Sequence, residues 1–181
     1  MLIKNKKLVV IIVTVSLLGV IFLYIYLNSS FYLNGNDKES IIKTIQSIDM
    51  HKNSTIELIE IKDIGEQRIV PFVDNGRPGY IHFVKNKYGN YEWKGTERSG
   101  GPLSDFLIHN RNGEEGKFNL LLLIVTTKEN KVAKMELNVN GYVFVEQFDM
   151  NKNSATWIEL PKEKEMRFTY NYYDENGNSI E

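Results

Sequence analysis

A run of twenty uncharged and mostly apolar residues near the N-terminus constrains this chain most. The run extends from Leu8 to Leu27 and reads LVVIIVTVSLLGVIFLYIYL. A helix needs about 20 such residues to cross the hydrocarbon core of a bilayer. The sequence therefore predicts a membrane-spanning helix at residues 8–27, which confines any folded domain to one side of it.

The charges beside this run predict its orientation. Lys4, Lys6 and Lys7 precede the run, and the next basic residue is Lys38. Positively charged residues favour the cytoplasmic side of a span, so residues 1–7 would form a cytoplasmic tail. We expect a single-pass protein of the cell membrane, with its N-terminus in the cytoplasm and its C-terminal domain extracellular.

A cleaved signal peptide is the main alternative for this segment. Such a peptide has an apolar core of about 7 to 15 residues, followed by a cleavage site of small residues. The run here is longer, and the best candidate cleavage site, Leu27-Asn28-Ser29, begins with a large residue. We therefore favour an uncleaved anchor. Lipid attachment through a cysteine is excluded, because the chain has no Cys.

The rest of the chain has the size of one domain. Residues 28–35 are polar and rich in turn-forming residues, which predicts a short stalk before a domain at residues 36–181. Without Cys this domain must depend on a packed core instead of disulfides. Three of the 22 basic residues lie in the tail, so the part outside the membrane has 19 basic and 23 acidic residues. This excess of acid argues against a nucleic-acid partner.

The periodicity of apolar residues predicts one helix followed by strands. Asn36 and Glu39 have the spacing of a capping box, and isoleucines recur at helical spacing up to about Met50. After residues 52–54 the pattern has the period of two that is typical of strands. The predicted fold class is α+β: an amphipathic helix packed on a mostly antiparallel, curved β-sheet. This sheet would be cystatin-like or NTF2-like, or would have a second β layer.

Nine segments have the alternation and the flanking turn residues of strands. They are residues 55–64, 68–73, 80–86, 91–97, 118–127, 132–139, 142–148, 157–160 and 167–173. Residues 120–125 are continuously apolar, so we expect a central strand that is covered on both faces. This stretch is too short for a second membrane crossing.

Two turns each predict how the two strands of a hairpin pair. A two-residue turn at Asn140-Gly141 would place Val139 opposite Tyr142, and all apolar side chains of the hairpin on one face. In the earlier hairpin, pairing of the strands around Gly89-Asn90 would place Val84 opposite Trp93 in the core.

The segment at residues 69–98 combines three recurring features. It reads IVPFVDNGRPGYIHFVKNKYGNYEWKGTER, with a hydrophobic strand, a D-N-x-R-P-G turn and a hairpin that ends in N-Y-E-W. In these features it resembles small exported or membrane-anchored proteins of Gram-positive bacteria. Such proteins have no established activity, so the resemblance implies a setting in the cell envelope and no catalytic residues.

The sequence lacks the motifs of common catalytic and cofactor sites. It has no Cys, no G-x-S-x-G and no glycine-rich phosphate loop between a strand and a helix. His51, His82 and His109 lie far apart and lack the spacing of metal ligands. We therefore predict no catalytic residue, no metal site and no cofactor. His82 should lie beside Gly95 across the hairpin.

Aromatic and arginine residues form the candidate ligand-binding surface. Rings of the earlier hairpin either fill the core or line an open groove, and a groove would suit a peptide or glycan. Arginines at the ends of hairpins could meet an anionic wall polymer or a carboxylate of a partner. Arg111 is one such arginine. The candidate ligand-binding residues are His82, Trp93, Arg98, Arg77 and Tyr80.

These observations favour a membrane-anchored, non-enzymatic binding or scaffolding module at the cell surface. Its partners would be the lipid bilayer, through residues 8–27, and an envelope protein or an anionic wall polymer. The alternative is an envelope enzyme of the hydrolase class that acts on peptide, lipid or glycan. The absence of an assembled nucleophile in the sequence distinguishes the two in favour of binding.

Overall fold

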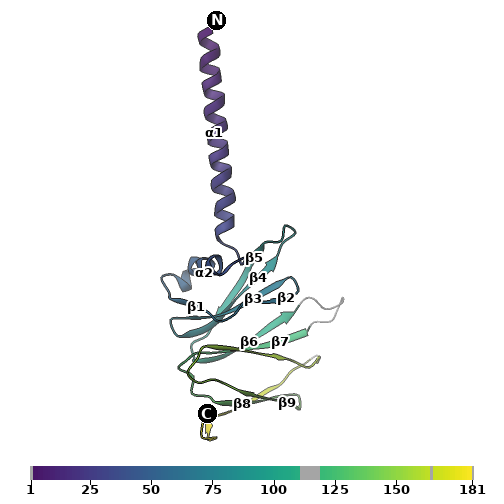
Figure 1. Ribbon diagram of the computed structural model, residues 1–181. Coiled ribbons are helices and arrows are strands. Elements are labelled where there is room, and N and C mark those ends of the chain that lie inside the picture. Colours follow the sequence, from purple (N-terminus) through teal and green to yellow (C-terminus); the bar gives the residue numbers. More distant parts are fainter. Residues whose placement is uncertain (1, 111–118, 164, 181) are drawn as a thin grey trace.

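A long helix, α1 (Leu2–Tyr32), projects from a stack of one short helix and three β-sheets (Figure 1). This computed structural model of the chain describes residues 2–110, 119–163 and 165–180. The side chains of α1 are described at residues 6, 7 and 9–24, and those at 9–24 are exposed. Among the residues whose side chains are described, no helix combines the length and the apolar character that a membrane crossing requires.

The first sheet, sheet A, lies nearest to α1 and carries α2 (Lys38–Ser47) on one face. The strand order is β1-β3-β4-β5, and β2 pairs with the part of β3 that β1 leaves open. A 3-10 turn, η1 (Asp49–His51), follows α2. The strands are β1 (Ile56–Leu58), β2 (Lys62–Ile64), β3 (Gln67–Asp74), β4 (Arg77–Lys85) and β5 (Tyr91–Arg98).

Two further sheets follow, and every strand pairing described is antiparallel. Sheet B has the order β10-β7-β6, and sheet C has the order β12-β11-β8-β9. The strands of sheet B are β6 (Leu103–Asn110), β7 (Asn119–Thr126) and β10 (Ser154–Glu159). Those of sheet C are β8 (Lys134–Val139), β9 (Tyr142–Gln147), β11 (Phe168–Tyr173) and β12 (Ser179–Ile180).

Three buried clusters hold the four layers together. The cluster between α2 and sheet A contains Ile41, Ile45, Val70, Phe72, Ile81, Phe83 and Tyr91. The cluster between sheets A and B contains Ile69, Tyr80, Phe106, Ile108, Leu123 and Val125. The cluster between sheets B and C contains Leu122, Ile124, Met135, Leu137, Val139, Phe148, Ile158 and Leu160. The α+β class and the antiparallel sheets are confirmed, while the cystatin-like or NTF2-like assignment stays a prediction.

The apolar run in β7 is the centre of this stack. Leu122 and Ile124 face sheet C, whereas Leu123 and Val125 face sheet A. The prediction of a central strand covered on both faces is therefore confirmed. Leu137 packs in the same cluster as Leu122, from the facing sheet C and not from a neighbouring strand.

The predicted capping box at the start of α2 is wrong by one residue. The N-cap is Asp37, whose Oδ1 accepts a hydrogen bond of 2.9 Å from the Ser40 amide. Asn36 instead binds the β4–β5 hairpin, since its Oδ1 accepts a hydrogen bond from the Tyr91 amide at 2.9 Å. The α-helix ends at Ser47, and η1 occupies the last predicted turn.

The strand predictions differ from the structure in several places, among them β12, which was missed, and β10, which begins at Ser154 and not at residue 157. The predicted strand at residues 55–64 is interrupted, because β1 and β2 pair with opposite ends of β3. β6 was missed, although Ser104, Phe106 and Ile108 alternate inward along it. Residue 118, at the start of another predicted strand, lies outside the described residues.

One of the two predicted hairpin registers is confirmed and the other is wrong. Asn140 and Gly141 both have positive φ, at 52° and 93°, and Val139 pairs with Tyr142. In the β4–β5 hairpin, however, Trp93 pairs with Phe83 and not with Val84. A bulge after His82 restores the predicted pairing of His82 with Gly95.

Candidate functional site

A cavity of about 300 Å³ lies between sheets A and B. Polar residues dominate its lining, although it adjoins the apolar cluster between the two sheets. Its lining residues are Gln67, Ile69, Tyr80, His82, Glu97, Leu107, Ile108 and His109. They come from β3, β4, β5 and β6, so the cavity exists only once sheet B has packed against sheet A. We refer to it as the interlayer pocket.

The alternation of β4 directs two of the predicted site residues into this pocket. Tyr80 and His82 are two residues apart in the strand, so they share the face toward sheet B. Ile81 and Phe83 point to the other face and pack under α2. The sequence prediction that Tyr80 and His82 belong to one site therefore agrees with their positions.

A hydrogen bond fixes the side chain of Tyr80 at the pocket wall. Its hydroxyl donates to Glu97 Oε1 at 2.8 Å, and its ring contacts Phe106 edge-on with 5.1 Å between the ring centroids. Burial raises the pKa of the Tyr80 phenol well above its usual value, and the neighbouring Glu97 carboxylate raises it further. Tyr80 therefore remains a neutral donor, and the Glu97 carboxyl group lies at the exposed rim.

Gln67 contributes a buried polar group without a hydrogen-bond partner among the described residues. Its side chain is 4% exposed, and the group is the Nε2 amide nitrogen. A buried donor without a partner costs about 1–3 kcal/mol. A ligand that accepts a hydrogen bond from this amide would remove that cost.

The pocket combines a buried floor with an exposed rim. Gln67 and Tyr80 are buried, while His109 and Leu107 are exposed, the latter to 44%. The volume is at the lower end of the about 300–1,000 Å³ typical of ligand pockets. Such a site fits a small polar molecule or one side group of a larger ligand.

The other predicted site residues lie on the opposite face of sheet A. Trp93 pairs with Phe83, whose side chain packs in the cluster under α2, and Trp93 itself is 46% exposed. Arg98 likewise points to the α2 face. The structure therefore separates Trp93 and Arg98 from Tyr80 and His82.

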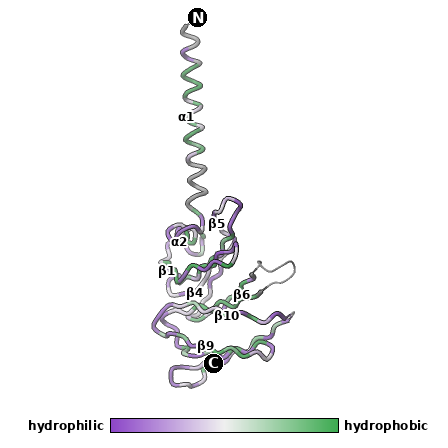
Figure 2. Tube along the Cα trace, turned by 45° about the vertical axis from the view of Figure 1, so that its right-hand side comes forward, coloured by the Kyte–Doolittle hydropathy of each residue, from purple (hydrophilic) through white to green (hydrophobic). Residues whose placement is uncertain are grey.

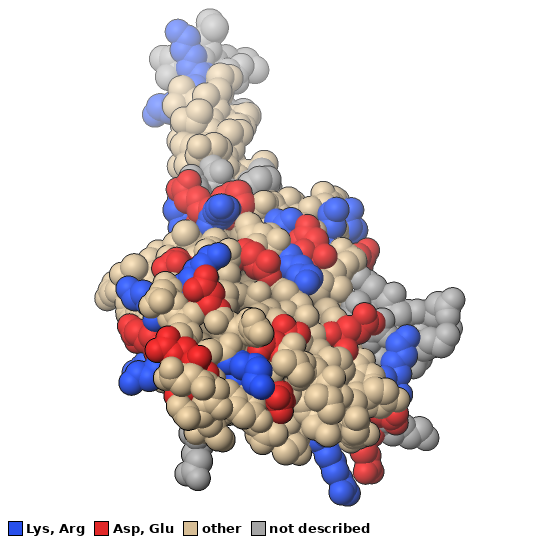
Figure 3. All heavy atoms as spheres, turned by 60° about the horizontal axis from the view of Figure 1, so that its bottom comes forward, with Lys and Arg blue, Asp and Glu red and all other residues tan. Residues whose placement is uncertain are grey.

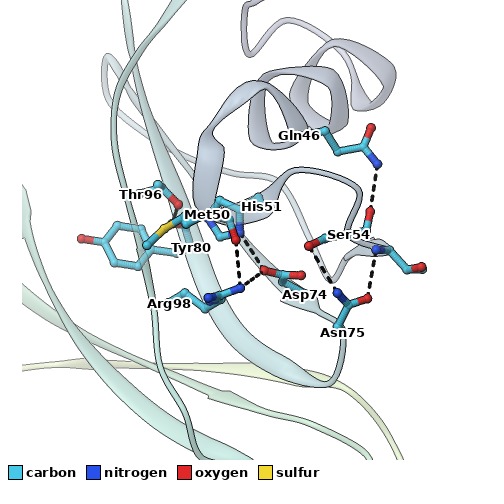
Figure 4. A network of polar contacts seen from close by, with 10 residues as sticks. Gln46, Met50, His51, Ser54, Asp74, Asn75, Tyr80, Thr96 and Arg98 are labelled. Carbon is cyan, nitrogen blue, oxygen red and sulfur yellow. Dashed lines mark hydrogen bonds and ion pairs between the residues drawn. The ribbon is translucent and has the colours of Figure 1, made fainter.

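Arg98 belongs to a buried polar network at the end of sheet A (Figure 4). Its guanidinium donates to Asp74 Oδ2 at 2.5 Å and to the carbonyl oxygen of Met50 at 3.1 Å. The same Asp74 oxygen lies 2.8 Å from His51 Nδ1, and both of these side chains are fully buried. The network connects η1 with the last residues of β3 and β5.

Opposing effects set the protonation of Asp74. Burial raises the pKa of this carboxyl, but the adjacent Ser54 hydroxyl, the His51 hydrogen bond and the Arg98 guanidinium together outweigh burial. The pKa of Asp74 is therefore below its usual value, and the group is ionised at neutral pH. A positively charged Arg98 is its counter-ion, so this partly exposed arginine contributes to the stability of the fold.

Of the two remaining predicted arginines, the structure describes one. Arg77 is exposed at the β3–β4 turn, where it pairs with Asp74 in the strand register. It therefore remains accessible to a partner. Arg111 lies outside the described residues.

Sequence reasoning missed Gln67, Glu97 and His109. Gln67 directly precedes one predicted strand and Glu97 ends another, but nothing in a sequence marks which face of a sheet will meet another sheet. His109 lies in β6, which was itself missed. The inward alternation of Ser104, Phe106 and Ile108 was the available signal for β6, but His109 falls on the other face of that strand, so this alternation does not place it in the pocket.

Neither the face shown in Figure 3 nor the described residues offer a second candidate site through charge or metal-ligating groups. On the face turned forward in Figure 3, which lies away from α1, basic and acidic side chains are interspersed. The described residues contain no group of three or more His, Cys, Asp or Glu that could hold a metal ion. The interlayer pocket is therefore the best-supported candidate site.

No protein-family model matches the chain, and neither a curated protein nor a solved structure shows significant similarity to it. The resemblance of residues 69–98 to small Gram-positive envelope proteins thus stays a prediction.

Proposed function

We propose that this chain is a single-pass, membrane-anchored binding module, with residues 36–181 outside the cell. In this proposal the domain has no chemistry of its own and presents the interlayer pocket to a small polar ligand or to a side group of an envelope partner. An envelope protein or an anionic wall polymer is the partner class.

The exposed apolar surface of α1 is the observation that carries the proposal. Its middle is hydrophobic on all sides (Figure 2), and side chains such as Val10 and Phe22 are 64% and 74% exposed. A helix that is apolar all round needs either a protein core or a membrane to cover it. Within the apolar run, the structure describes the side chains of sixteen consecutive uncharged residues, 9–24. The proposal of a complete membrane span therefore depends on the sequence of residues 8–27.

The charge pattern supports the orientation. Lys6 and Lys7 lie before the apolar run, and no basic residue follows it within α1. A reporter enzyme that is active only outside the cell, fused after Glu181, should therefore be active. Activity of a cytoplasmic reporter at the same position, or a mature N-terminus near Ser30, would contradict the anchor.

The chemistry of the interlayer pocket supports binding. Gln67 offers an unused amide donor, and Glu97 offers a carboxylate at the rim. A ligand with a carbonyl or carboxylate oxygen and a neighbouring hydroxyl or amine would match both. Among the described lining residues there is no aliphatic hydroxyl and no thiol that could act as a nucleophile.

Titrations followed by NMR test the pocket. The probes are acetate, N-acetylglucosamine and the dipeptide alanyl-alanine, added to protein labelled at its glutamine side-chain amides. We expect one probe to shift the Gln67 amide resonance saturably, and binding of that probe to be at least about tenfold weaker in Gln67→Leu. Gln147→Leu, on the exposed part of β9, is the matched control and should bind as the wild type does. The absence of a saturable shift with every probe would contradict the proposal.

The envelope hydrolase remains the second candidate, because His82 and Glu97 line the same pocket. A general base at this position would lose its function in His82→Ala. Hydrolysis of peptide, ester or glycan substrates that disappears in this variant would favour the enzyme over the binding module.

A further inference from the structure

The β4–β5 hairpin reaches toward the membrane beside the base of α1. In Figures 1 and 2, which differ by a rotation of 45°, the hairpin rises next to the lower end of α1. Its turn lies between Lys85 and Tyr91, the residues that end β4 and begin β5. We call residues 85–91 the hairpin tip.

Hydrogen bonds fix the hairpin tip to the segment that leaves α1. The Gly35 amide donates to the Tyr91 carbonyl oxygen at 2.8 Å, and the Asn36 side chain donates to Asn90 Oδ1 at 3.0 Å. Asn36 also accepts a hydrogen bond from the Tyr91 amide. The position of the tip relative to the end of α1 is therefore set by direct contacts.

The length of α1 beyond its apolar run matches the thickness of the headgroup zone. From Leu27 to Tyr32 the helix rises about 7.5 Å. The polar zone on each side of the hydrocarbon core is about 5–7 Å thick. Tyr88 lies three residues from Tyr91 and thus within about 11 Å of it. These distances leave the hairpin tip within reach of the lipid headgroups.

The composition of the hairpin tip suits that location. Tyr88 is 77% exposed, with the Lys87 ammonium 4.9 Å from its ring centroid. Lys85 and Lys87 are exposed, and residues 85–91 include no acid. Aromatic rings and basic side chains are the groups that proteins place at an anionic membrane surface.

The acidic groups around the tip are few and mostly engaged. Glu92 accepts hydrogen bonds from Asn86 at 2.9 Å and from Lys94 at 3.1 Å. Glu66, in the adjacent β2–β3 turn, is exposed, and its carbonyl oxygen accepts a hydrogen bond from the Lys85 amide. The tip itself thus presents two positive charges, and Asp63, which pairs with Arg68 at 2.6 Å, partly offsets that of Lys85.

We propose that the hairpin tip contacts the anionic headgroups of the bilayer that α1 enters, with Tyr88 in the interface and Lys85 and Lys87 near lipid phosphates. This inference rests on the proposed membrane anchor. The contact fixes the tilt of the domain on the membrane and leaves the interlayer pocket and sheets B and C turned away from it.

The absence of Cys allows a single-site test on the full chain in lipid nanodiscs. An environment-sensitive fluorophore is attached to Tyr88→Cys, to Leu18→Cys in the apolar run, or to Asn176→Cys in the exposed β11–β12 turn. Nanodiscs contain phosphatidylcholine alone or with phosphatidylglycerol, and a small fraction of lipid carries a quencher in its headgroup or in its acyl chain.

The label at position 88 should be quenched from the headgroup, and the label at position 176 should not. Phosphatidylglycerol should increase the equilibrium constant of the contact between the tip and the lipid by about fivefold for each lysine near the surface. Lys85→Gln combined with Lys87→Gln should remove that lipid dependence, whereas Lys152→Gln, exposed elsewhere, should leave it unchanged.

The label at position 18 separates the two proposals. Quenching of position 18 from the acyl chain, together with a position 88 that stays in water, would overturn the hairpin contact and leave the anchor intact. A water-exposed position 18 would overturn both. A quenched position 88 that persists in the double glutamine variant would refute the role of the two lysines.

Discussion

His51 and Asp74 form a fully buried pair, with His51 Nδ1 2.8 Å from Asp74 Oδ2. The pair fixes the turn after α2 to the end of β3, and Arg98 adds the positive charge that balances Asp74. Neither member of the pair reaches a surface, so the arrangement is a stabilising contact and not a site.

Replacing Arg98 should destabilise the fold. Arg98→Ala leaves the Asp74 charge buried without its counter-ion, and we expect a loss of about 3 kcal/mol, at the low end for such a change because Arg98 is partly exposed. Arg77→Ala, at the exposed turn nearby, should change stability by less than about 0.5 kcal/mol. Urea unfolding in detergent micelles, followed by tryptophan fluorescence, measures both. Equal small effects would show that Arg98 is not needed as a counter-ion.

Stability should fall in acid partly through Asp74. Its pKa is lower in the folded chain than in the unfolded chain, so the unfolded chain binds more protons as the pH falls. The contribution of Asp74 is complete above the ordinary carboxyl pKa of about 4 and is lost as the pH falls through the folded value. Melting temperatures measured between neutral pH and pH 2 should decline less steeply for Asp74→Asn than for the wild type. Parallel curves would contradict this linkage.

The core between sheets B and C should be sensitive to truncation. Leu122 and Leu137 are both fully buried there, and Leu→Ala at either position should cost about 2–5 kcal/mol. Leu107→Ala, at a position that is 44% exposed on β6, is the control and should cost much less. The free energy of unfolding from urea titrations distinguishes them. A Leu137→Ala variant as stable as Leu107→Ala would refute the packing of sheet C on sheet B.

Two glycines of the β4–β5 hairpin should respond differently to a methyl group. A Cβ at Gly79 would lie 2.6 Å from the Glu97 carbonyl oxygen and 3.1 Å from the Phe72 ring, whereas a Cβ at Gly95 would meet nothing within 4 Å. Gly79→Ala should therefore lower the melting temperature by several degrees, through overpacking of about 1–3 kcal/mol. Gly95→Ala should leave it unchanged or raise it slightly. The reverse order in thermal unfolding would contradict the close packing of β4 on β5.

Local chemistry in the sequence predicted much of the fold. Asn140-Gly141 is a strong signal for a two-residue turn, and the register it predicts is the register observed. The apolar run of β7 likewise predicted its central position. In β6, by contrast, the buried positions begin with Ser104 while Leu107 is exposed, which obscures the alternation. The bulge in β5 was also invisible, since Lys94 is an ordinary strand residue in the sequence.

The candidate site could be predicted only in part. Tyr80 and His82 share a strand face, and the period of two in β4 is sufficient to group them. Their separation from Trp93 depends on the bulge after His82, a tertiary feature. Arg98 lies opposite Gly79, so the period of two already separates it from Tyr80. The interlayer pocket arises where sheet A and β6 meet through packing, and no spacing along the chain encodes that meeting.

The strand order of the last two sheets limits the order in which the layers of the domain can fold. After β6 and β7 in sheet B, the chain enters sheet C with β8 and β9, returns to sheet B with β10, and enters sheet C again with β11 and β12. Neither of these sheets can be completed before the other has begun, whereas α2 and sheet A are complete once β5 has formed. During N-to-C synthesis the layer next to α1 can therefore close early. The outer two layers must assemble together, after nearly the whole chain has emerged.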